Sequence, residues 1–444
     1  MTAAATPRYA WYGDDFTGAS DTLATLAAAG RRALLFLAPP SPTRLAAAGP
    51  LDALGIAGIA RALDPAAMAA EMRPVARCFA DLAPDITHYK CCSTFDSAVT
   101  VGNLVHGLEA LRRPEHEHTP VVLGGQPSLG RHCAFGTLFA TAQAGGEVHR
   151  IDRHPTMRSH PVTPMHEADL RRHLETLGLP GVALIDLRAL DAAVAAATVE
   201  PIQRAVMERL SARPRALLFD TTRDAHLGRI GQWLWERARQ RPQRVLGASS
   251  VAQAALAHWP GMPDTSLATV RGATPAASPV FLLVGSLSPV TAAQAAHARG
   301  AYHQVLIDPS VLLHDAAAAS ALARHCSDLL AQGRSVMART TAPATDAPPP
   351  LTVAGLCARL LAEVIGNSPQ VRRVGVAGGD TSSLAVRALP AWGLAWQGAL
   401  GTGVPLLRLH ADDAPLDGLE LMLKGGQMGP PDVFMRLRDG APPF

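Results

Sequence analysis

Lysine is nearly absent from this sequence. Only Lys90 and Lys424 occur among the 40 basic residues, so the other 38 are arginine. This bias is typical of a GC-rich coding background, which replaces lysine wherever arginine will serve. The two lysines that remain are candidates for functional sites, because a compact ammonium does work that a planar guanidinium does not.

The sequence also lacks the patterns of several protein classes. Its six cysteines include no Cys-x-x-Cys pair, which excludes a zinc ribbon and a disulfide framework. No apolar run reaches the roughly 18 residues of a membrane-spanning helix. The N-terminus has neither the basic start nor the apolar stretch of a secretory leader. We therefore expect a cytoplasmic protein with no membrane partner.

The chain also lacks an excess of either positive or negative charge. Lys+Arg number 40 and Asp+Glu number 37, for a net charge of +3 without long runs of either sign. This balance excludes nucleic acid as the main partner. With 444 residues, of which 48% are hydrophobic, the chain can bury two or three domain cores. We expect small-molecule ligands and leave the oligomeric state, a homo-oligomer included, open.

The hydrophobic pattern indicates the fold class. Short apolar runs alternate with amphipathic stretches, which predicts βαβ units. Residues 259–278 are rich in Pro, Gly, Ser and Thr and lack periodicity, so we expect a linker there. The prediction is an α/β chain with domains at residues 1–258 and 279–444, each a mainly parallel β-sheet flanked by helices, and an active-site cleft between the domains. We further predict one helix over Asp191–Ala212, a structured loop over a pocket at residues 124–164 and a surface loop over residues 342–350.

The first candidate site follows the first predicted strand, Tyr9–Gly13. Asp14, Asp15, Thr17 and Gly18 stand where that strand ends and a helix begins. Ligands bind at the carboxyl ends of strands in open α/β sheets, so these residues can supply a general base and groups that bind a polyol. The alternative is that Asp15 or Thr17 only caps the helix.

A second candidate site follows the predicted strand Ile86–Cys91. Lys90 is followed closely by Ser93 and Thr94, and a cation beside small hydroxyl groups suits a carboxylate or phosphate. The alternative is a surface lysine next to helix-capping residues. Cys91 and Cys92 are expected to be small buried hydrophobic residues rather than nucleophiles or metal ligands.

Arg131 and His160 lie in the third candidate region. Arg131 follows a glycine turn and can bind a carboxylate with its planar guanidinium. His160 belongs to a proline-rich run that carries several histidines. These histidines lack the helical i, i+4 spacing of a metal-binding pair, so we expect no protein metal site.

Three glycine-bearing turns stand out in the second half. Each follows a predicted strand, and glycines and hydroxyls at a helix start present N–H groups to an anion, so the three turns together predict a phosphate-binding cradle. Each turn alone is more often a plain strand-to-helix connection than a binding site, and it is the occurrence of three in one domain that favours binding. No GxxxxGK[ST] or GxGxxG pattern occurs, which disfavours a P-loop and a standard dinucleotide fold. The cradle residues are Gly285, Ser286, Ser288, Gly378, Gly379, Asp380, Thr381, Lys424, Gly425 and Gly426.

Together these motifs resemble those of the four-carbon acid sugar kinase family. The resemblance runs over nearly the whole chain, through GDDFTGASD, KCCSTFDS, HPVTPM, GSLSPVT, AGGDTS and LKGGQMG. It implies an N-terminal substrate domain, a C-terminal ATP domain and phosphorylation of a small sugar acid. The second and third motifs are closer to the 3-oxo-tetronate kinase branch than to the threonate and erythronate branch. The start WYGDDFTG and the Gly-Arg turn QPSLGRHCAFG depart from the usual patterns and also suit a kinase for the branched acid 3-oxo-isoapionate.

The resemblance also assigns roles to residues. Asp14, Asp15, Thr17 and Gly18 match the first substrate loop, Lys90, Ser93 and Thr94 the second, and Arg131 the Gly-Arg turn. Ser286 matches the family's serine turn, residues 378–381 match its glycine-glycine-acid-threonine turn, and residues 424–426 match its C-terminal lysine-glycine turn. We expect Asp15 to accept the proton of the attacking hydroxyl, Asp14 to orient the substrate, and Lys90 with Arg131 to hold its carboxylate. Mg²⁺ is expected to arrive with ATP, with Asp380 as one ligand through water. A non-catalytic sensor of sugar acids or nucleotides, and a dehydrogenase or aldolase, remain the alternatives.

Overall fold

A computed structural model of the chain describes residues 7–116, 119–142, 145–160, 162–261, 271–341 and 348–443. The chain divides into two compact units, residues 1–33 with 38–268 and residues 34–37 with 269–444. The predicted linker at 259–278 and the predicted loop at 342–350 fall partly outside the described residues. The exact domain boundaries and the cleft between the domains stay predictions.

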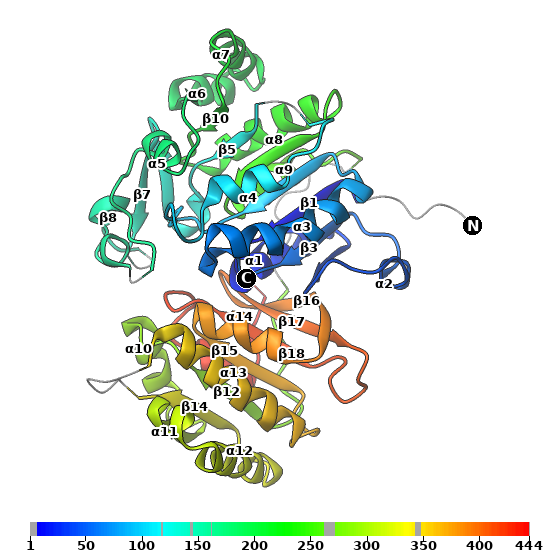
Figure 1. Cartoon of the computed structure of the whole chain (residues 1–444), viewed down its shortest axis with the longest axis vertical. Coiled ribbons are helices and arrows are strands. Elements are labelled where there is room, and N and C mark those ends of the chain that lie inside the picture. The colour runs from blue at the N-terminus through cyan, green and yellow to red at the C-terminus, as the bar shows by residue number, and fades with distance from the viewer. Residues whose placement is uncertain are drawn as a thin grey trace. The chain divides into compact units, whose positions relative to one another are not determined.

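The first unit is built on a parallel sheet (Figure 1). Its strand order is β3-β1-β4-β11-β5-β10-β9, and the neighbouring strands run parallel. Helix α8 packs on α9, with α1 beside α9, whereas α3 packs with α4. The elements of this sheet and its helices are β1 (Tyr9–Gly13), α1 (Phe16–Ala28), α2 (Pro42–Ala48), β3 (Ala53–Ala57), α3 (Pro65–Leu82), β4 (Ile86–Lys90), α4 (Leu104–Ala110), β5 (Val121–Leu123), α5 (Leu170–Thr176), β9 (Val182–Ile185), α6 (Leu187–Ala195), α7 (Glu200–Leu210), β10 (Ala216–Phe219), α8 (Asp224–Ala238), β11 (Gln243–Gly247) and α9 (Ser250–Ala257).

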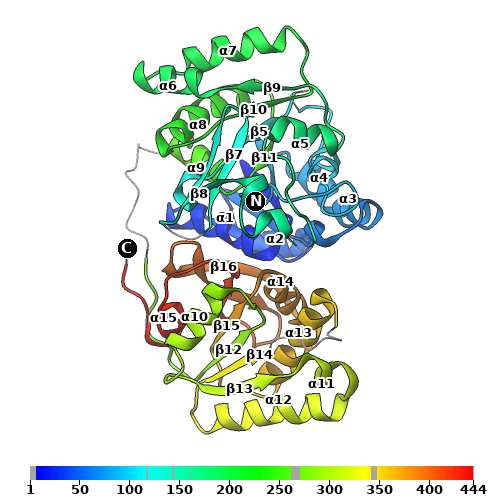
Figure 2. The same ribbon diagram turned by 90° about the vertical axis from the view of Figure 1, so that its left-hand side faces the viewer.

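The second unit has a mixed sheet, with strand order β13-β14-β12-β15-β18-β17-β16-β2. Alternate residues of β12, Val280, Leu282 and Val284, join a core with residues of α10 and α15, two helices that lie next to one another (Figure 2). Helices α11 to α14 pack with one another in sequence. The elements are β2 (Ala33–Phe36), β12 (Val280–Val284), α10 (Pro289–His297), β13 (His303–Ile307), α11 (Pro309–His314), α12 (Ala316–Ala331), β14 (Val336–Thr340), α13 (Pro350–Gly366), β15 (Arg373–Ala377), α14 (Gly379–Ala388), β16 (Ala391–Gly401), β17 (Val404–Ala411), β18 (Glu420–Lys424) and α15 (Val433–Asp439).

The predicted α/β class and the mainly parallel sheets are confirmed. Strand β2 departs from the expected division, because it comes from the N-terminal half and pairs antiparallel with β16 in the second unit. Phe36 stacks on Trp392, with ring centroids 5.9 Å apart. In the part of the chain that the structure describes, no helix has the length and apolar character to cross a membrane.

The single helix predicted over Asp191–Ala212 is wrong. The structure has α6, which ends at Ala195, and α7, which begins at Glu200. Ala197 between them has a φ of 53°, which an α-helix does not allow. Pro201 lies in the first turn of α7, where a proline needs no N–H partner. That proline was the signal for a second helix start.

The loop predicted over residues 124–164 is also wrong in part. This segment holds a separate three-stranded antiparallel sheet, β6-β7-β8. The turn between β6 and β7 is tied to β10 by Asp220, whose carboxylate accepts the N–H groups of Phe135 (2.7 Å) and Gly136 (2.9 Å). The strands and one-turn 3₁₀ helices of the segment are η2 (Pro127–Leu129), β6 (Arg131–Ala134), β7 (Thr137–Thr141), β8 (Val148–Arg150), η3 (Ile151–Arg153) and η4 (Met157–Ser159).

A buried histidine in β4 predicts how acid affects stability. His88 lies between the Tyr9 hydroxyl, 2.7 Å from Nδ1, and the Gly247 carbonyl oxygen, 3.0 Å from Nε2. Burial lowers the pKa of His88 to about 3. Between pH 6.5 and 3 the unfolded chain therefore binds a proton that the folded chain does not, so the free energy of unfolding falls as the pH falls.

We expect His88 to remove about 2 kcal/mol of stability between pH 6.5 and 5, because each unit of pH in this window costs about 1.4 kcal/mol. Urea unfolding at a series of pH values measures this slope. The His88→Gln variant is expected to be less stable at pH 7.5 and to lose less stability on acidification. Parallel slopes for the two proteins would contradict the prediction.

Candidate active site

Three loops of the first unit meet at the carboxyl ends of β1, β3 and β4. Gly13, the last residue of β1, is the register partner of Lys90, the last residue of β4. The Asp14 N–H donates to the Lys90 carbonyl oxygen (3.0 Å), and the Arg61 N–H donates to the Asp14 carbonyl oxygen (3.1 Å). The structure therefore brings the first two predicted loops together, as parallel strands require.

Asp15 caps helix α1 and does more than cap it. Its Oδ1 accepts the Gly18 N–H (2.7 Å) and its Oδ2 accepts the Thr17 hydroxyl (2.9 Å). A Cβ at residue 18 would lie 2.2 Å from Lys90 Nζ and 2.5 Å from Asp15 Oδ1. Only glycine lets the helix start approach both groups. The capping interpretation of Asp15 is therefore confirmed, and its functional role stays a prediction.

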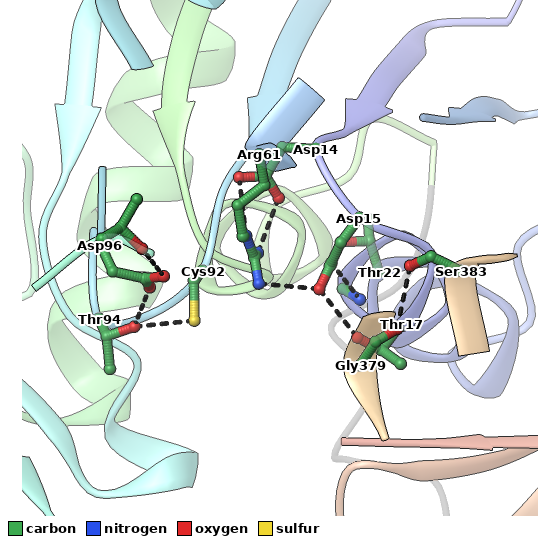
Figure 3. A network of polar contacts seen from close by, with 12 residues as sticks. Asp14, Asp15, Thr17, Thr22, Arg61, Cys92, Thr94, Asp96, Gly379 and Ser383 are labelled. Carbon is green, nitrogen blue, oxygen red and sulfur yellow. Dashed lines mark hydrogen bonds and ion pairs between the residues drawn. The ribbon is translucent and has the colours of Figure 1, made fainter. Parts of the chain in front are cut away.

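Arg61 joins the two carboxylates, and the sequence analysis did not select it. Its Nη2 lies 2.8 Å from Asp14 Oδ1 and its Nη1 lies 2.8 Å from Asp15 Oδ2. Figure 3 shows the guanidinium between the two acids. In the sequence, Arg61 is an arginine shortly after the apolar run of β3. Many strands end in this way, so its position alone did not distinguish it from other arginines.

The two aspartates differ in their electrostatics. Burial raises the pKa of Asp14 to about 6, although Arg61 and Lys90 act against this rise. Burial would also raise the pKa of Asp15, but Arg61, Lys90, the Gly18 N–H and the Thr17 hydroxyl outweigh it and lower that pKa. The Asp14 side chain is 2% exposed and that of Asp15 is 14% exposed. Asp15 is thus the ionised and more accessible carboxylate.

The residues after Lys90 form a second network, centred on Asp96. Thr94 Oγ1 lies 2.5 Å from Asp96 Oδ1 and 2.8 Å from Cys92 Sγ (Figure 3). Thr163 Oγ1 donates to Asp96 Oδ2 (3.2 Å), and the Thr163 N–H donates to His160 Nδ1 (3.1 Å). His160 Nδ1 is therefore an acceptor, which leaves Nε2 as the donor of this ring. The predicted residues Thr94 and His160 belong to one network.

Two of the predicted substrate-binding residues, Lys90 and Arg131, are cations without a carboxylate partner among the described residues. Lys90 is 4% exposed and makes no ion pair in this part of the chain. The Arg131 guanidinium donates to the Leu129 carbonyl oxygen, and its buried Nε has no hydrogen-bond partner. Burial lowers the pKa of Arg131. Ser93, three residues after Lys90, is buried. Such cations suit an anionic ligand.

The three glycine-bearing turns of the second unit meet at the ends of β12, β15 and β18. The N–H groups of Gly285 (2.9 Å) and Ser286 (3.0 Å) donate to the Ala377 carbonyl oxygen, and the Gly378 N–H donates to the Lys424 carbonyl oxygen (2.8 Å). A Cβ at residue 285 would lie 2.3 Å from Thr381 Oγ1. The close approach of these turns therefore requires glycine.

The same turns begin two helices. Ser288 is the N-cap of α10, and its Oγ accepts the Thr291 N–H (3.1 Å). Gly379, Asp380 and Thr381 form the start of α14. The N-termini of α10 and α14 follow the strand ends where the three turns meet, which is an arrangement that attracts phosphate. Among the described residues, no three His, Cys, Asp or Glu side chains are grouped so as to hold a metal ion.

Lys424 is fully buried within its own turn. Its Nζ donates to the carbonyl oxygens of Gly425 (2.9 Å) and Met428 (3.1 Å) and to Thr291 Oγ1 (3.1 Å). Burial lowers the pKa of Lys424 to about 7. The surrounding oxygen acceptors match the three donors of an ammonium and favour its charged form. The Lys424 side chain thus holds the carbonyl groups of its own turn in place.

Comparison with known proteins decides the family. Residues 9–255 match the family description "Sugar-binding N-terminal domain", and residues 281–434 match "Nucleotide-binding C-terminal domain". The chain belongs to the four-carbon acid sugar kinase family. This membership confirms the expected enzyme class, a sugar-acid kinase. The two site regions described above fall within the two matched domains.

Named relatives cover nearly the whole chain. A 3-oxo-isoapionate kinase of Paraburkholderia graminis is 35% identical, over 97% of this chain and 94% of its own. A 3-oxo-tetronate kinase of Methylobacterium radiotolerans is 31% identical, over 96% and 97%. A solved structure from Salmonella typhimurium LT2 has a TM-score of 0.76 at 24% identity, over 96% of this chain and 98% of the other, and it supports the fold.

Proposed function

We propose that this kinase transfers the γ-phosphoryl group of ATP to a hydroxyl of a four-carbon sugar acid of the 3-oxo-tetronate type. The observation that supports it most is the cluster of Asp14, Asp15, Arg61 and Lys90 within the domain matched as sugar-binding. It combines an ionised carboxylate with a buried ammonium that lacks a partner among the described residues. A sugar acid offers a hydroxyl to the first group and a carboxylate to the second.

Asp15 is the proposed base. Phosphoryl transfer proceeds through a loose transition state, so the acceptor hydroxyl needs to be oriented and to lose its proton late. A carboxylate with a lowered pKa suits that task, because it is always ionised when the substrate arrives. Asp14, held by Arg61, is proposed to orient the substrate. The hydroxyl groups of the substrate are proposed to contact Thr17, Gly18, Ser93, Thr94 and His160.

Lys90 and Arg131 are proposed to hold the substrate carboxylate. Lys90 is buried and Arg131 is half-buried, and neither forms an ion pair with a described carboxylate. A bound anion would restore the charge balance that burial disturbs. Arginine binds a carboxylate with two parallel N–H donors, whereas lysine supplies a point charge.

The three glycine-bearing turns of the second unit are proposed to bind the phosphates of ATP. Their N–H groups and the N-termini of α10 and α14 favour negative charge.

Mg²⁺ neutralises charge on the transferring phosphates when it is bound. Asp380 in the first turn of α14 is a carboxylate of the type Mg²⁺ accepts, and this ion keeps several waters and needs few protein ligands. Transfer requires that the acceptor hydroxyl and the γ-phosphate meet during turnover.

ADP formation in the presence of ATP, Mg²⁺ and a panel of sugar acids tests the proposal. The panel contains 3-oxo-tetronate, threonate, erythronate and the branched five-carbon acid 3-oxo-isoapionate. We expect acid-dependent ADP release and a phosphorylated acid detectable by phosphorus NMR. Preference for the branched acid would move the assignment to the alternative that the relative from Paraburkholderia graminis supports. Binding of both ligands without ADP release would identify a sensor instead.

The raised pKa of Asp14 predicts a pH dependence of the reaction. This carboxylate is ionised above about pH 6 and protonated below it. Protonation removes its attraction for Arg61 and for the substrate, so we expect kcat/KM to fall below about pH 6. The residual activity of the Asp14→Asn variant should lack this step, which separates it from titration of ATP. An identical step in both proteins would contradict the assignment.

A further inference from the structure

The turn after β18 has its carbonyl groups directed at helix α10. The Gly426 carbonyl oxygen accepts two hydroxyl groups of that helix, Ser288 Oγ (2.5 Å) and Thr291 Oγ1 (2.8 Å). One helical turn further on, Gln294 Nε2 lies 3.1 Å from the Met428, 3.0 Å from the Gly429 and 3.1 Å from the Pro430 carbonyl oxygen. The three side chains, at positions 288, 291 and 294, share one face of α10.

Lys424 completes this arrangement from the opposite end of the turn. Its Nζ donates to the Gly425 carbonyl oxygen and to Thr291 Oγ1, whose own proton goes to the Gly426 carbonyl oxygen. Thr291 and Gln294 are 0% and 1% exposed. Both are thus buried polar side chains that are held by the backbone of a single turn, and not by the hydrophobic core alone.

The direction of the carbonyl groups fixes the direction of the amide groups. In a planar trans peptide the C=O and N–H bonds point to opposite sides. The carbonyl groups of Gly425 and Gly426 are held inward, so the N–H groups of Gly426 and Gln427 point away from that hydrogen-bond network. Within the described part of the chain neither N–H makes a hydrogen bond. Successive outward N–H groups form an anion-binding concavity.

We propose that Thr291 and Gln294 are positioning residues that set this turn for nucleotide phosphate. They touch no substrate atom and act by holding the carbonyl groups, which leaves the two amide groups free for phosphate oxygen atoms. A Cβ at residue 426 would lie 2.8 Å from Ser286 Oγ, so a larger residue there would displace that hydroxyl. The inference rests on the proposed function of the second unit as the ATP site.

Calorimetric titration of the full chain with ADP and with adenosine tests the inference. The Thr291→Val variant removes one hydroxyl, and the Gln294→Glu variant replaces an amide donor with an acceptor of equal size. Each is expected to weaken ADP binding about tenfold, the equivalent of one hydrogen bond to a charged group. Adenosine, which has no phosphate, should bind each variant as it binds the wild type. The KM for ATP should rise with little change in kcat.

Two further variants separate positioning from general stability. Thr291→Ser keeps the hydroxyl and should retain ADP affinity. Gln304→Met removes a glutamine that donates to the Tyr302 carbonyl oxygen elsewhere in the second unit, so it controls for the loss of such a bond. Urea unfolding identifies any variant that fails to fold. If either Thr291→Val or Gln294→Glu fails to fold, the ADP affinity of the other one tests the positioning role.

The outcomes distinguish the two proposals. Unchanged ADP affinity in folded Thr291→Val and Gln294→Glu variants would overturn the positioning role. Equal weakening of ADP and adenosine binding would also overturn it, because a disturbed fold has no preference for phosphate. A wild-type chain that binds no ADP would overturn the proposed ATP site itself.

Discussion

Replacing Asp15 by asparagine is expected to lower turnover by about 10² or more, the usual effect of losing a general base. Asparagine keeps an oxygen that can accept the Gly18 N–H, so helix α1 remains capped. It cannot take up the hydroxyl proton, and it no longer balances the charge of Arg61. ADP affinity should be unchanged, since the proposed nucleotide turns belong to the second unit.

The assay for this variant measures ADP formation at saturating ATP and sugar acid, with ADP binding measured separately. Asp64→Asn is a matched control. Asp64 also caps a helix of the first unit, accepting the N–H groups of Ala66 and Ala67, and it lies at an exposed position. It should keep nearly full turnover. Near-normal turnover in Asp15→Asn would refute the assignment of the base.

Replacing Arg61 by methionine is expected to cost about 3–5 kcal/mol of unfolding free energy, the range for breaking a buried ion pair from one side. Asp14 and Asp15 would lose their shared counter-ion, and Asp14, at 2% side-chain exposure, cannot regain it from water. Its pKa should rise further, so that the orienting carboxylate is protonated near neutral pH. Turnover should fall together with stability.

Urea unfolding of Arg61→Met, compared with Arg150→Met, tests this expectation. Arg150 pairs with Asp152 at a half-exposed position, and exposed pairs contribute little. Adding Asp14→Asn to Arg61→Met should restore part of the lost stability, because the uncompensated charge is then gone. Additive losses in the double variant would show that the two side chains do not form a functional pair.

Local signals in the sequence identified most of the residues in the two site regions. An acid pair, a lysine or a glycine turn directly after an apolar run can be read without knowing the fold, and the structure brings the loops of each unit together. Their roles as ligands of substrate and nucleotide stay predictions. Arg61 could not be found in this way, because it is one of 38 arginines. Its partner Asp14 is 47 positions away.

The features of the fold that the sequence analysis did not predict also depend on contacts or patterns that single residues do not reveal. Strand β2 reads like any other strand of the first half, and only its pairing with β16, more than 350 residues later, assigns it to the second unit. In the antiparallel sheet β6-β7-β8, β6 has 4 residues and β8 only 3, which is too short for a period to be read. Burial alternates along β7, but its sequence TLFAT places three apolar residues next to one another and hides this alternation. The break between α6 and α7 was readable from Pro201, which a continuous helix does not tolerate.

The position of β2 affects how the protein can be divided. A gene fragment that begins after residue 270 encodes every other strand of the second unit's sheet but leaves out its terminal strand. Residues of β16 such as Gly393 and Leu394 would then expose unpaired backbone groups along an open edge, which promotes aggregation. The nucleotide-binding half of this kinase is therefore not encoded by one continuous stretch of the gene, and a C-terminal fragment that begins after residue 270 should be insoluble.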